Sequence, residues 1–577
     1  MRSEQSGVTA SRGLALGRAR IRAPRIIDTE ERSLPSDAVE NEVGRLQDAI
    51  CAARTELARL RDRVQGALAQ EVGEFIDMHA LLLDDPELLA GLTGLIRTGR
   101  FTAGYALRLQ RDRLVAVFDA MDDPYLRSRR EDVEHVLGRV HAALQRGQDE
   151  GDIIGLAGEV LITDSVAPTE LLPMVERGVV AVLVSRGSPM SHSAILARSL
   201  GMPMLIAPAE ALAAIPEGAA VMVDAGRGQI IVEPGAEDLA DLREREQAEA
   251  REQRSLVRLR NAATRTLDGA DIALWANAES RDEVARARQL GAAGVGLLRT
   301  EFLFLQRSEP PSEEEQYAAY RDAILAMEGR TVTLRTLDLG ADKADAAGIA
   351  LAHEPNPALG LRGVRLALAR PALLRTQLRA MLRAAAHGPV RILVPMVSRR
   401  EEMLAMRRAL REYARELRRE GHAAAPDTPL GAMIEVPAAA FALPTMLDTM
   451  DFVSIGTNDL IQYLLAADRA NDALGELFSP LHPAVIRALH EIIDACRRAG
   501  TPVALCGEMA GDARCTRLLL ALGLSEFSMH PASLLEVRAA VRRCELRTLR
   551  RRAGALLRAR DRAALERLLA RLQASAS

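Results

Sequence analysis

Apolar and polar positions change their spacing along the chain, and each spacing predicts a different kind of structure. Between residues 22 and 146, apolar residues recur every three or four positions, as at Val43, Leu46 and Ile50. This spacing is typical of amphipathic helices, which Asp-Asp-Pro runs at 84–86 and 122–124 separate. We therefore predict a helical bundle over residues 22–146. Its apolar stripes would form a core, or alternatively an exposed groove for a partner.

Short apolar runs replace the helical spacing after residue 152. They predict strands at residues 160–162, 179–184, 203–206, 220–223 and 230–232. Two further short strands fit residues 1–21, joined by a glycine turn. Together these strands predict an α/β domain over residues 1–21 and 147–235, with the helical bundle inserted into it. Residues 236–261 are charged and poor in apolar anchors, which indicates a solvated linker helix.

Residues 262–577 alternate strand candidates with helical stretches. The strand candidates are residues 271–278, 294–300, 331–338, 390–397, 430–436, 451–457, 502–508 and 526–530. Eight such units in a stretch of this length predict a (β/α)8, or TIM, barrel. The predicted fold is therefore multidomain α/β: an N-terminal α/β domain with an inserted helical bundle, a helical linker and a C-terminal barrel.

Polar and reactive residues gather at the ends of the predicted barrel strands, where such barrels carry their functional groups. They are Arg299, Arg335 with Asp338, Glu435, Asn458 with Asp459, and Cys506. The arginines suit a phosphate or carboxylate, and the carboxylates of Glu435 and Asp459 suit Mg²⁺. Cys506 is a neutral acid that could move a proton. Taken singly, Cys506 is more simply a core residue and Glu435 a salt-bridge partner. As a set, they suit a small phosphorylated acid.

A second candidate site lies at residues 187–198. Gly187, Ser188 and Pro189 break the preceding strand, and Ser191 then suits a helix N-cap. His192 would lie in the first turn, where outward-pointing N–H groups favour an anion such as a phosphate. Taken alone, one histidine of ten is more simply a surface residue at a helix start. The order of strand, break and helix favours the functional interpretation.

Composition narrows the range of partners. The chain has 75 basic and 79 acidic residues, a net charge of −4, which argues against nucleic acid. No apolar run approaches the roughly 20 residues of a membrane helix, and no secretory signal is apparent.

The five cysteines lack zinc-like spacing, so a reduced cytoplasm fits best. Lys343 is the only lysine, which indicates either chance or a site that requires a compact ammonium group.

Several runs resemble the phosphoenolpyruvate-utilising enzymes, and in particular enzyme I of the bacterial phosphotransferase system. These runs are residues 187–198, 294–302, 356–362, 437–440, 455–460 and 506–512. The resemblance extends over nearly the whole chain in the same domain order. The chain departs from the residues usual in that family at Ala167, Ser188, Met190, Ala341, Val436 and Ala470.

The resemblance implies a phosphoenolpyruvate–protein phosphotransferase. Phosphoenolpyruvate would bind in the barrel with Mg²⁺ held by Glu435 and Asp459, and His192 would carry its phosphoryl group to an HPr-type phosphocarrier protein docked on the helical bundle. The substrate would be bound by Arg299, Arg335, Lys343, Asn458, Asp459 and Arg469. Cys506 would protonate the enolate to give pyruvate. The resemblance also implies a homodimer formed through the barrel, without membrane insertion.

Two alternatives stay open from the sequence. A phosphoenolpyruvate synthase or pyruvate-phosphate dikinase relative would need a large ATP-binding domain, for which this chain leaves no room. A non-catalytic or slow regulatory protein could sense phosphoenolpyruvate in a nitrogen-type relay. The carrier protein, and the choice between sugar uptake and regulation, are also left open.

Overall fold

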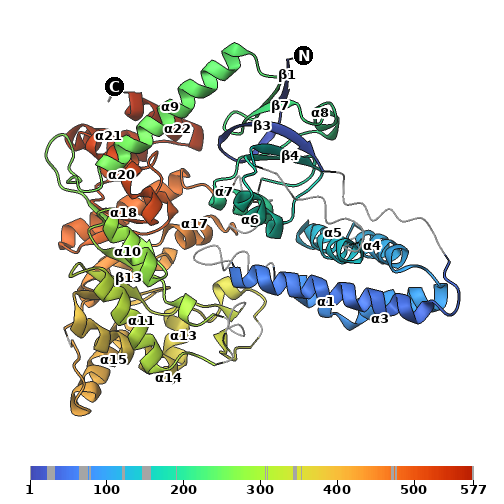
Figure 1. The fold of residues 1–577 in the computed structure, drawn as a ribbon. Coiled ribbons are helices and arrows are strands. Elements are labelled where there is room, and N and C mark those ends of the chain that lie inside the picture. Colours follow the sequence, from blue (N-terminus) through green and yellow to red (C-terminus); the bar gives the residue numbers. More distant parts are fainter. Residues whose placement is uncertain are drawn as a thin grey trace. The chain divides into compact units, whose positions relative to one another are not determined.

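The computed structural model describes residues 2–22, 33–63, 76, 79–119, 124–145, 157–189, 191–305, 307, 309–341, 347–352, 354–425, 427–468, 474 and 477–574. The chain divides into two compact units, Met1–Glu249 and Ala250–Ser577 (Figure 1). Each unit is built on its own sheet.

In its described part, the first unit contains one eight-stranded sheet. In spatial order its strands are β1 (Ser3–Ser6), β8 (Gln229–Val232), β7 (Ala220–Asp224), β3 (Leu14–Ile21), β4 (Glu159–Thr163), β5 (Ala181–Val184), β6 (Met204–Ile206) and β2 (Val8–Ser11). Strands β3, β4, β5 and β6 are parallel neighbours. The N-terminal strands thus join the sheet formed by the later strands, as predicted.

The N-terminus differs from the prediction in one respect, because residues 2–22 contain three strands where two were expected. The additional strand is β1, whose sequence is Ser-Glu-Gln-Ser and which pairs with β8 at the edge of the sheet. An edge strand without apolar residues gives no hydrophobic pattern to detect.

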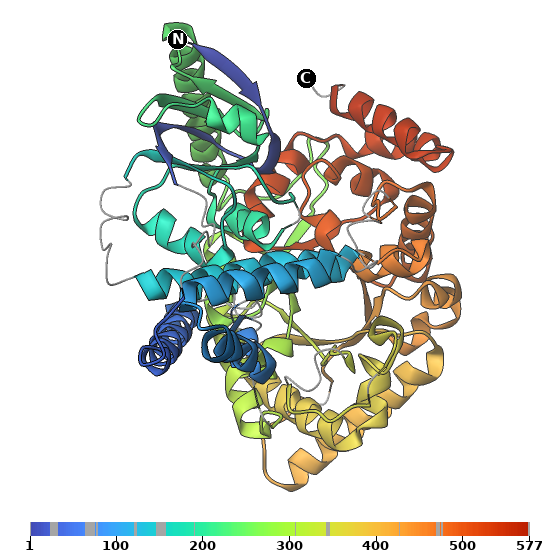
Figure 2. The same cartoon turned by 90° about the vertical axis from the view of Figure 1, so that its right-hand side faces the viewer.

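The chain between β3 and β4 forms the predicted helices. They are α1 (Val39–Arg63), α3 (Pro86–Gly99), α4 (Ala103–Asp119) and α5 (Pro124–Gln145). Helix α5 packs against α4 and α1, and α3 packs against α4, as Figure 2 shows in blue and cyan. The apolar stripes meet in a core that includes Leu46, Leu57, Leu92, Ile96 and Leu107. Of the helix expected at residues 75–83, residues 75, 77 and 78 lie outside the described residues, and residues 76 and 79–83 are helical.

Three described helices of the first unit follow β4: α6 (Pro168–Glu176), α7 (His192–Leu200) and α8 (Ala209–Ala213). Helix α9 (Ala236–Arg258) begins in the first unit and ends in the second. Helix α9 occupies the stretch expected to be a linker. Its Leu242 packs against Met222 and Ile231 of the sheet, so apolar contact fixes this part of the helix.

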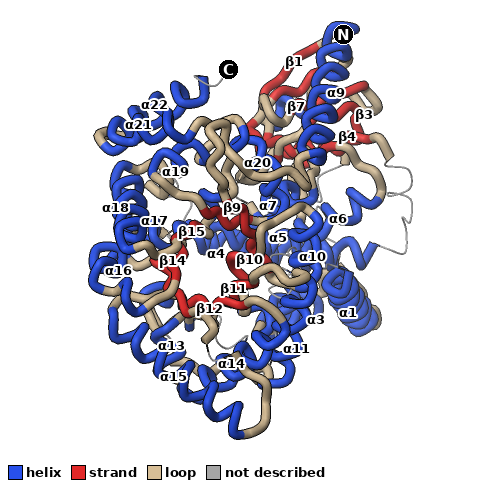
Figure 3. Tube along the Cα trace, turned by 90° about the vertical axis from the view of Figure 1, so that its left-hand side faces the viewer, coloured by secondary structure: helices blue, strands red, loops and turns tan. Residues whose placement is uncertain are grey.

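Within the described residues, the second unit is a closed barrel of eight parallel strands, seen along its axis in Figure 3. The strands are β9 (Ala273–Ala278), β10 (Val295–Leu298), β11 (Val332–Arg335), β12 (Val390–Val394), β13 (Leu430–Ile434), β14 (Phe452–Ile455), β15 (Val503–Leu505) and β16 (Glu526–Met529). Each lies inside its predicted range, so the predicted barrel is confirmed.

Helices surround this barrel (Figure 3). They are α10 (Arg281–Gln289), α11 (Glu313–Ala326), α13 (Val364–Ala369), α14 (Pro371–Ala384), α15 (Arg400–Arg419), α16 (Pro437–Ala442), α17 (Thr457–Leu465), α18 (Pro483–Ala499), α19 (Thr516–Leu522), α20 (Leu534–Arg542), α21 (Leu546–Leu557) and α22 (Arg562–Ala574). Across the described residues of both units, no helix has the length and apolar character needed to cross a membrane.

Candidate functional site

The carboxyl ends of the barrel strands carry most of the residues that the sequence singled out. Arg299 directly follows β10, and Arg335 is the last residue of β11. Glu435 follows β13, Cys506 follows β15, and Asn458 and Asp459 lie in the first turn of α17, just after β14. Because parallel strands end on one side of a barrel, these residues face a common region.

A chain of charged contacts joins Arg335 to Asp459. Arg335 lies 3.4 Å from Asp338 through Nη1 and Oδ2, and 3.1 Å from Glu301 through Nη2 and Oε1. Arg362 donates from Nε and Nη2 to the two Asp338 oxygens, at 3.0 and 2.9 Å. Its Nη1 reaches Oδ1 of Asp459 at 3.5 Å. Burial lowers the pKa of Arg335, but Glu301, Asp338 and Glu435 raise that pKa more, so the guanidinium stays charged.

Glu435 lies at the centre of this acidic region. Its side chain is 1% exposed, and Oε1 accepts a hydrogen bond from the Met396 N–H at 2.6 Å. Burial, followed by the charges of Asp459 and Asp338, raises the pKa of Glu435 well above its usual range. A Cβ atom at Gly456 would lie 2.6 Å from Glu435 Oε2, so glycine leaves room for the carboxylate.

The donor set fits Mg²⁺. Glu435 and Asp459 offer carboxylate oxygens, and a bound cation would offset the repulsion that raises the pKa of Glu435. Among the described residues, no three His, Cys, Asp or Glu side chains are grouped to hold a metal ion by themselves. Mg²⁺ commonly takes only one or two carboxylates and completes its shell with substrate phosphate and water, so two carboxylates suffice.

Cys506 is buried beside these charges. It is 5% exposed, and its Sγ lies 3.5 Å from the Ile455 carbonyl oxygen. Asn277 Nδ2 donates to the Cys506 carbonyl at 2.9 Å, which holds the backbone in place. Burial raises the pKa of the thiol to about 11. The charge of Glu435 raises this pKa by a smaller amount, and the charge of Arg335 lowers it. The thiol is therefore protonated at neutral pH.

Asn458 and Arg299 are held by glutamates. Asn458 donates to Glu508 Oε1 at 3.2 Å and accepts from the Glu508 N–H at 3.1 Å, which joins α17 to the segment after β15. Arg299 donates from Nη1 to Glu279 Oε1 at 2.7 Å, and its side chain is 41% exposed. Its exposed guanidinium is accessible to a ligand.

The structure thus brings together six of the predicted residues: Arg299, Arg335, Glu435, Asn458, Asp459 and Cys506. Lys343 and Arg469 lie outside the described residues. Sequence reasoning gave no role to Arg362, to Glu301 or to Tyr463, whose hydroxyl accepts a hydrogen bond from Arg362 Nη1 at 3.3 Å. Arg362 follows no barrel strand, so its only signal was its place in the family-like run 356–362.

The segment around His192 forms the predicted helix start. Helix α7 begins at His192, and the Oγ of its N-cap, Ser191, accepts from the Ala194 N–H at 3.3 Å. Ser193 donates from its buried Oγ to the Val166 carbonyl at 2.5 Å. The predicted cap is confirmed, whereas the side chain of His192 lies outside what the structure describes.

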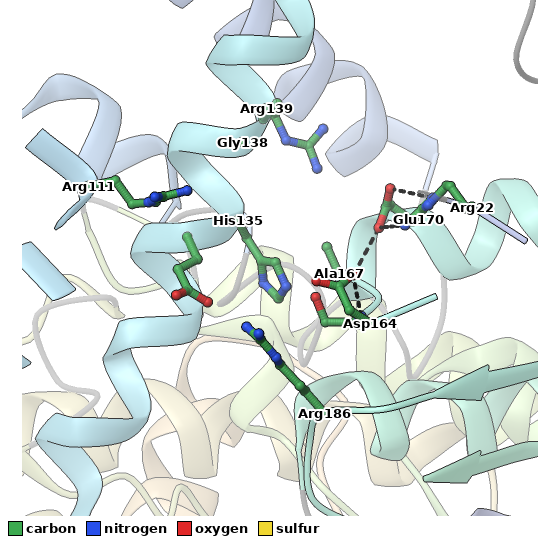
Figure 4. Close-up of a pocket in the computed structure, with 11 residues that line it drawn as sticks. Arg22, Arg111, His135, Gly138, Arg139, Asp164, Ala167, Glu170 and Arg186 are labelled. Atoms are coloured by element: carbon green, nitrogen blue, oxygen red, sulfur yellow. Dashed lines mark hydrogen bonds and ion pairs between the residues drawn. The ribbon is translucent and has the colours of Figure 1, made fainter. Parts of the chain in front are cut away.

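A cavity of about 90 Å³ lies in the first unit beside this segment (Figure 4). It is bounded by α4, α5, the start of α6 and the carboxyl ends of β3, β4 and β5. Its lining residues are Arg22, Arg111, Glu134, His135, Gly138, Arg139, Asp164, Ser165, Ala167, Glu170 and Arg186. Arg22 pairs with Glu170 at 3.1 Å. Because Val166 lies between two lining residues, the Ser193 hydrogen bond fixes the first turn of α7 to the wall of this cavity.

Family comparisons match three parts of the chain. They are described as the N-terminal part of a PEP-utilising enzyme at residues 6–129, the mobile domain at 155–228 and the PEP-binding domain at 253–546. The last match alone covers more than half of the chain. The chain belongs to the PEP-utilising enzymes. The resemblance based on sequence motifs is therefore confirmed.

Individual PEP-utilising enzymes match nearly end to end. A phosphoenolpyruvate-protein phosphotransferase of Cupriavidus necator is 43% identical, with 92% of this chain and 93% of the relative covered. Proteins of that name from Geobacillus stearothermophilus and Staphylococcus epidermidis are 38% and 35% identical. The match to the Geobacillus stearothermophilus protein covers 93% of this chain and 92% of that protein. The match to the Staphylococcus epidermidis protein covers 92% of this chain and 93% of that protein.

Proposed function

We propose that this enzyme transfers the phosphoryl group of phosphoenolpyruvate to its own His192 and then to a histidine of an HPr-type carrier protein, releasing pyruvate. The observation that carries this proposal is the joined set of Arg335, Asp338, Arg362 and Asp459 beside the buried Glu435 at one end of the barrel. The names of the near full-length relatives favour this reaction over a synthase, a dikinase or a sensor without turnover.

The barrel end would bind the substrate through opposite charges. Arg299 and Arg335 present guanidinium groups that match phosphate and carboxylate oxygens, and Asn458 adds an amide. Glu435 and Asp459 would hold Mg²⁺, which would neutralise phosphate charge when bound. Lys343 and Arg469 complete the proposed set on the strength of the resemblance alone. Phosphoryl transfer requires mainly positioning and charge neutralisation, which is what these residues supply.

Cys506 is the proposed proton donor. When the phosphoryl group leaves, the P–O bond breaks and its electron pair remains on the enolate of pyruvate. The thiol then gives its proton to the methylene carbon of the enolate, and solvent later restores the thiol. A pKa of about 11 keeps this proton on sulfur at neutral pH until the enolate, a stronger base, forms.

The remaining parts of the proposal concern assembly. The carrier protein would dock on the helices α1, α3, α4 and α5, and the chain would dimerise through its barrel and act in the cytoplasm. The docking surface and the dimer follow from the family resemblance, the cytoplasm follows from the cysteine pattern, and all three stay predictions. Copurification with an HPr-type carrier and measurement of mass in solution would test the first two directly.

Labelled phosphoenolpyruvate tests the reaction itself. With Mg²⁺ present, we expect acid-labile label on the wild-type protein and none on His192→Ala. The matched control is His422→Ala, which removes an exposed histidine from the turn after α15 and should label like the wild type. Full labelling of His192→Ala would overturn the proposal.

A further inference from the structure

One glutamine on α14 contacts both of the loops that follow Arg299 and Arg335. Gln377 is 2% exposed, and its Oε1 accepts a hydrogen bond from the Leu337 N–H at 2.9 Å. Its Nε2 donates to Thr300 Oγ1 at 3.1 Å. Thr300 is the residue after Arg299, and Leu337 lies two residues after Arg335, so a single amide contacts both loops.

Thr300 strengthens this connection. Thr300 is 1% exposed, and its hydroxyl donates to the carbonyl oxygen of Arg335 at 3.0 Å while it accepts from Gln377. The backbone of one arginine is therefore bonded to the side chain of the residue next to the other. This contact runs directly between the ends of neighbouring strands β10 and β11.

Further hydrogen bonds hold the side-chain amide of Gln377 on the side away from Thr300 and Leu337. Gln377 Nε2 also donates to Tyr320 OH at 3.2 Å, and this hydroxyl donates to Gln316 Oε1 at 3.1 Å. Gln316 in turn donates to the Pro311 carbonyl at 2.8 Å. Both amide hydrogens of Gln377 and its oxygen are thus used, which permits only one orientation of the group.

We propose that Gln377 is a positioning residue that sets the spacing of Arg299 and Arg335. It lies outside the substrate region and acts through Thr300 and Leu337. A buried amide is stable only while its partners stay in place, so the three hydrogen bonds hold both loops to α14. The consequence for catalysis rests on the proposed function, because the two arginines would then meet the same substrate in a fixed geometry.

The test compares two buried glutamines of one network. Gln377→Leu removes the bonds to both arginine loops, whereas Gln316→Leu removes only the outer bonds to Tyr320 and Pro311. Both variants should lower the melting temperature. In single-turnover labelling by phosphoenolpyruvate, we expect kcat/KM to fall about 10- to 100-fold for Gln377→Leu and less than about 3-fold for Gln316→Leu. Equal kinetics in the two variants would overturn the proposal.

A threonine pair repeats the test with a smaller change. Thr300→Val removes the hydroxyl and should slow the same half-reaction, whereas Thr300→Ser keeps it and should restore the wild-type rate. Transfer from phosphorylated protein to the carrier should be unchanged in all variants, because it does not use the arginines. If Thr300→Val and Thr300→Ser behave alike, the positioning role is wrong.

Hydrogen exchange separates this inference from the proposed function. Gln377→Leu should speed exchange at the Leu337 amide at least tenfold, with or without phosphoenolpyruvate, and Gln316→Leu should not. Unchanged exchange would show that Gln377 does not hold the loop. A wild-type protein that takes no label would instead overturn the proposed reaction.

Discussion

The two units hold their reactive groups by different forces. In the barrel, the half-buried Arg335 and Arg362 are joined to the buried Asp338 by ion pairs of 2.9–3.4 Å. In the first unit, the start of the His192 helix is held by hydroxyl groups, through the Ser191 cap and the Ser193 bond to Val166. Because these ion pairs hold the charged side chains in fixed positions, the barrel end is preorganised for a charged substrate. Under the proposed function, His192 would meet two partners in turn, and neutral contacts at its helix start would leave its charge free for the phosphoryl group.

Removal of the Cys506 thiol, the proposed acid, should slow the reaction in the barrel and leave the first unit unaffected. We expect Cys506→Ala to slow pyruvate formation by about 100- to 10,000-fold, the usual contribution of a general acid. Binding of phosphoenolpyruvate should be retained, because Cys506 is not among the charged groups that would bind it. Steady-state pyruvate release and a separate binding titration measure the two quantities.

Another buried thiol provides the control for Cys506. Cys496→Ala removes a fully buried thiol from α18, on the outside of the barrel, and should leave the rate of pyruvate formation near that of the wild type. Transfer from phosphorylated His192 to a carrier should also be normal in Cys506→Ala. A wild-type rate of pyruvate release in Cys506→Ala would mean that another group gives the proton.

Alkaline pH should destabilise the barrel more than the first unit. Burial raises the pKa of Cys496 and Cys515 to about 12 and that of Cys506 to about 11. In the unfolded chain a cysteine titrates near pH 8.5, roughly as in model peptides. Above that pH the folded barrel binds more protons than the unfolded chain, so its stability falls as pH rises. Three thiols should cost roughly 3–4 kcal/mol between pH 9 and pH 10.

Hydrogen exchange of the full chain at pH 8 and pH 10, corrected for the intrinsic pH dependence of exchange, measures this difference. Among the described residues of the first unit the only cysteine is Cys51, which is exposed. Peptides from the eight-stranded sheet of the first unit should therefore keep their protection against hydrogen exchange better than peptides from the barrel. Triple replacement of Cys496, Cys506 and Cys515 by Ala should remove most of the alkaline loss. Equal loss of protection in the two units would argue against control by the buried thiols.

The barrel could be predicted from the sequence because its strands are short apolar runs that end in polar residues. Val390–Val394 is one example: it is buried almost throughout, and helical stretches precede and follow it. The edge strand β1 escaped prediction because its four residues are polar. Its position depends on pairing with β8, more than 200 residues away, and no local pattern encodes such a pairing.

The residues of the candidate site that directly follow a barrel strand could be predicted from the sequence. Glu435 and Cys506 follow their strands directly, so topology alone places them together. Arg362 precedes α13 and reaches Asp338 and Asp459 across the barrel end, and Gln377 reaches two loops from α14. Long side chains that act across elements depend on tertiary packing, which spacing along the chain does not reveal.

The smallest expected effect tests whether the neutral contacts at His192 matter for transfer. Ser191→Ala removes the cap of α7, and Ser280→Ala removes the cap of α10, where Ser280 Oγ accepts from the Glu283 N–H at the same distance of 3.3 Å. Each should cost its helix about 1 kcal/mol, measured by hydrogen exchange at the helix start. Only Ser191→Ala should also slow labelling of His192, by about twofold to fivefold, because its helix carries this proposed acceptor. If Ser280→Ala slows labelling as much, the effect comes from general destabilisation, and the contrast between a charge-ordered barrel and a neutrally held histidine loses its support.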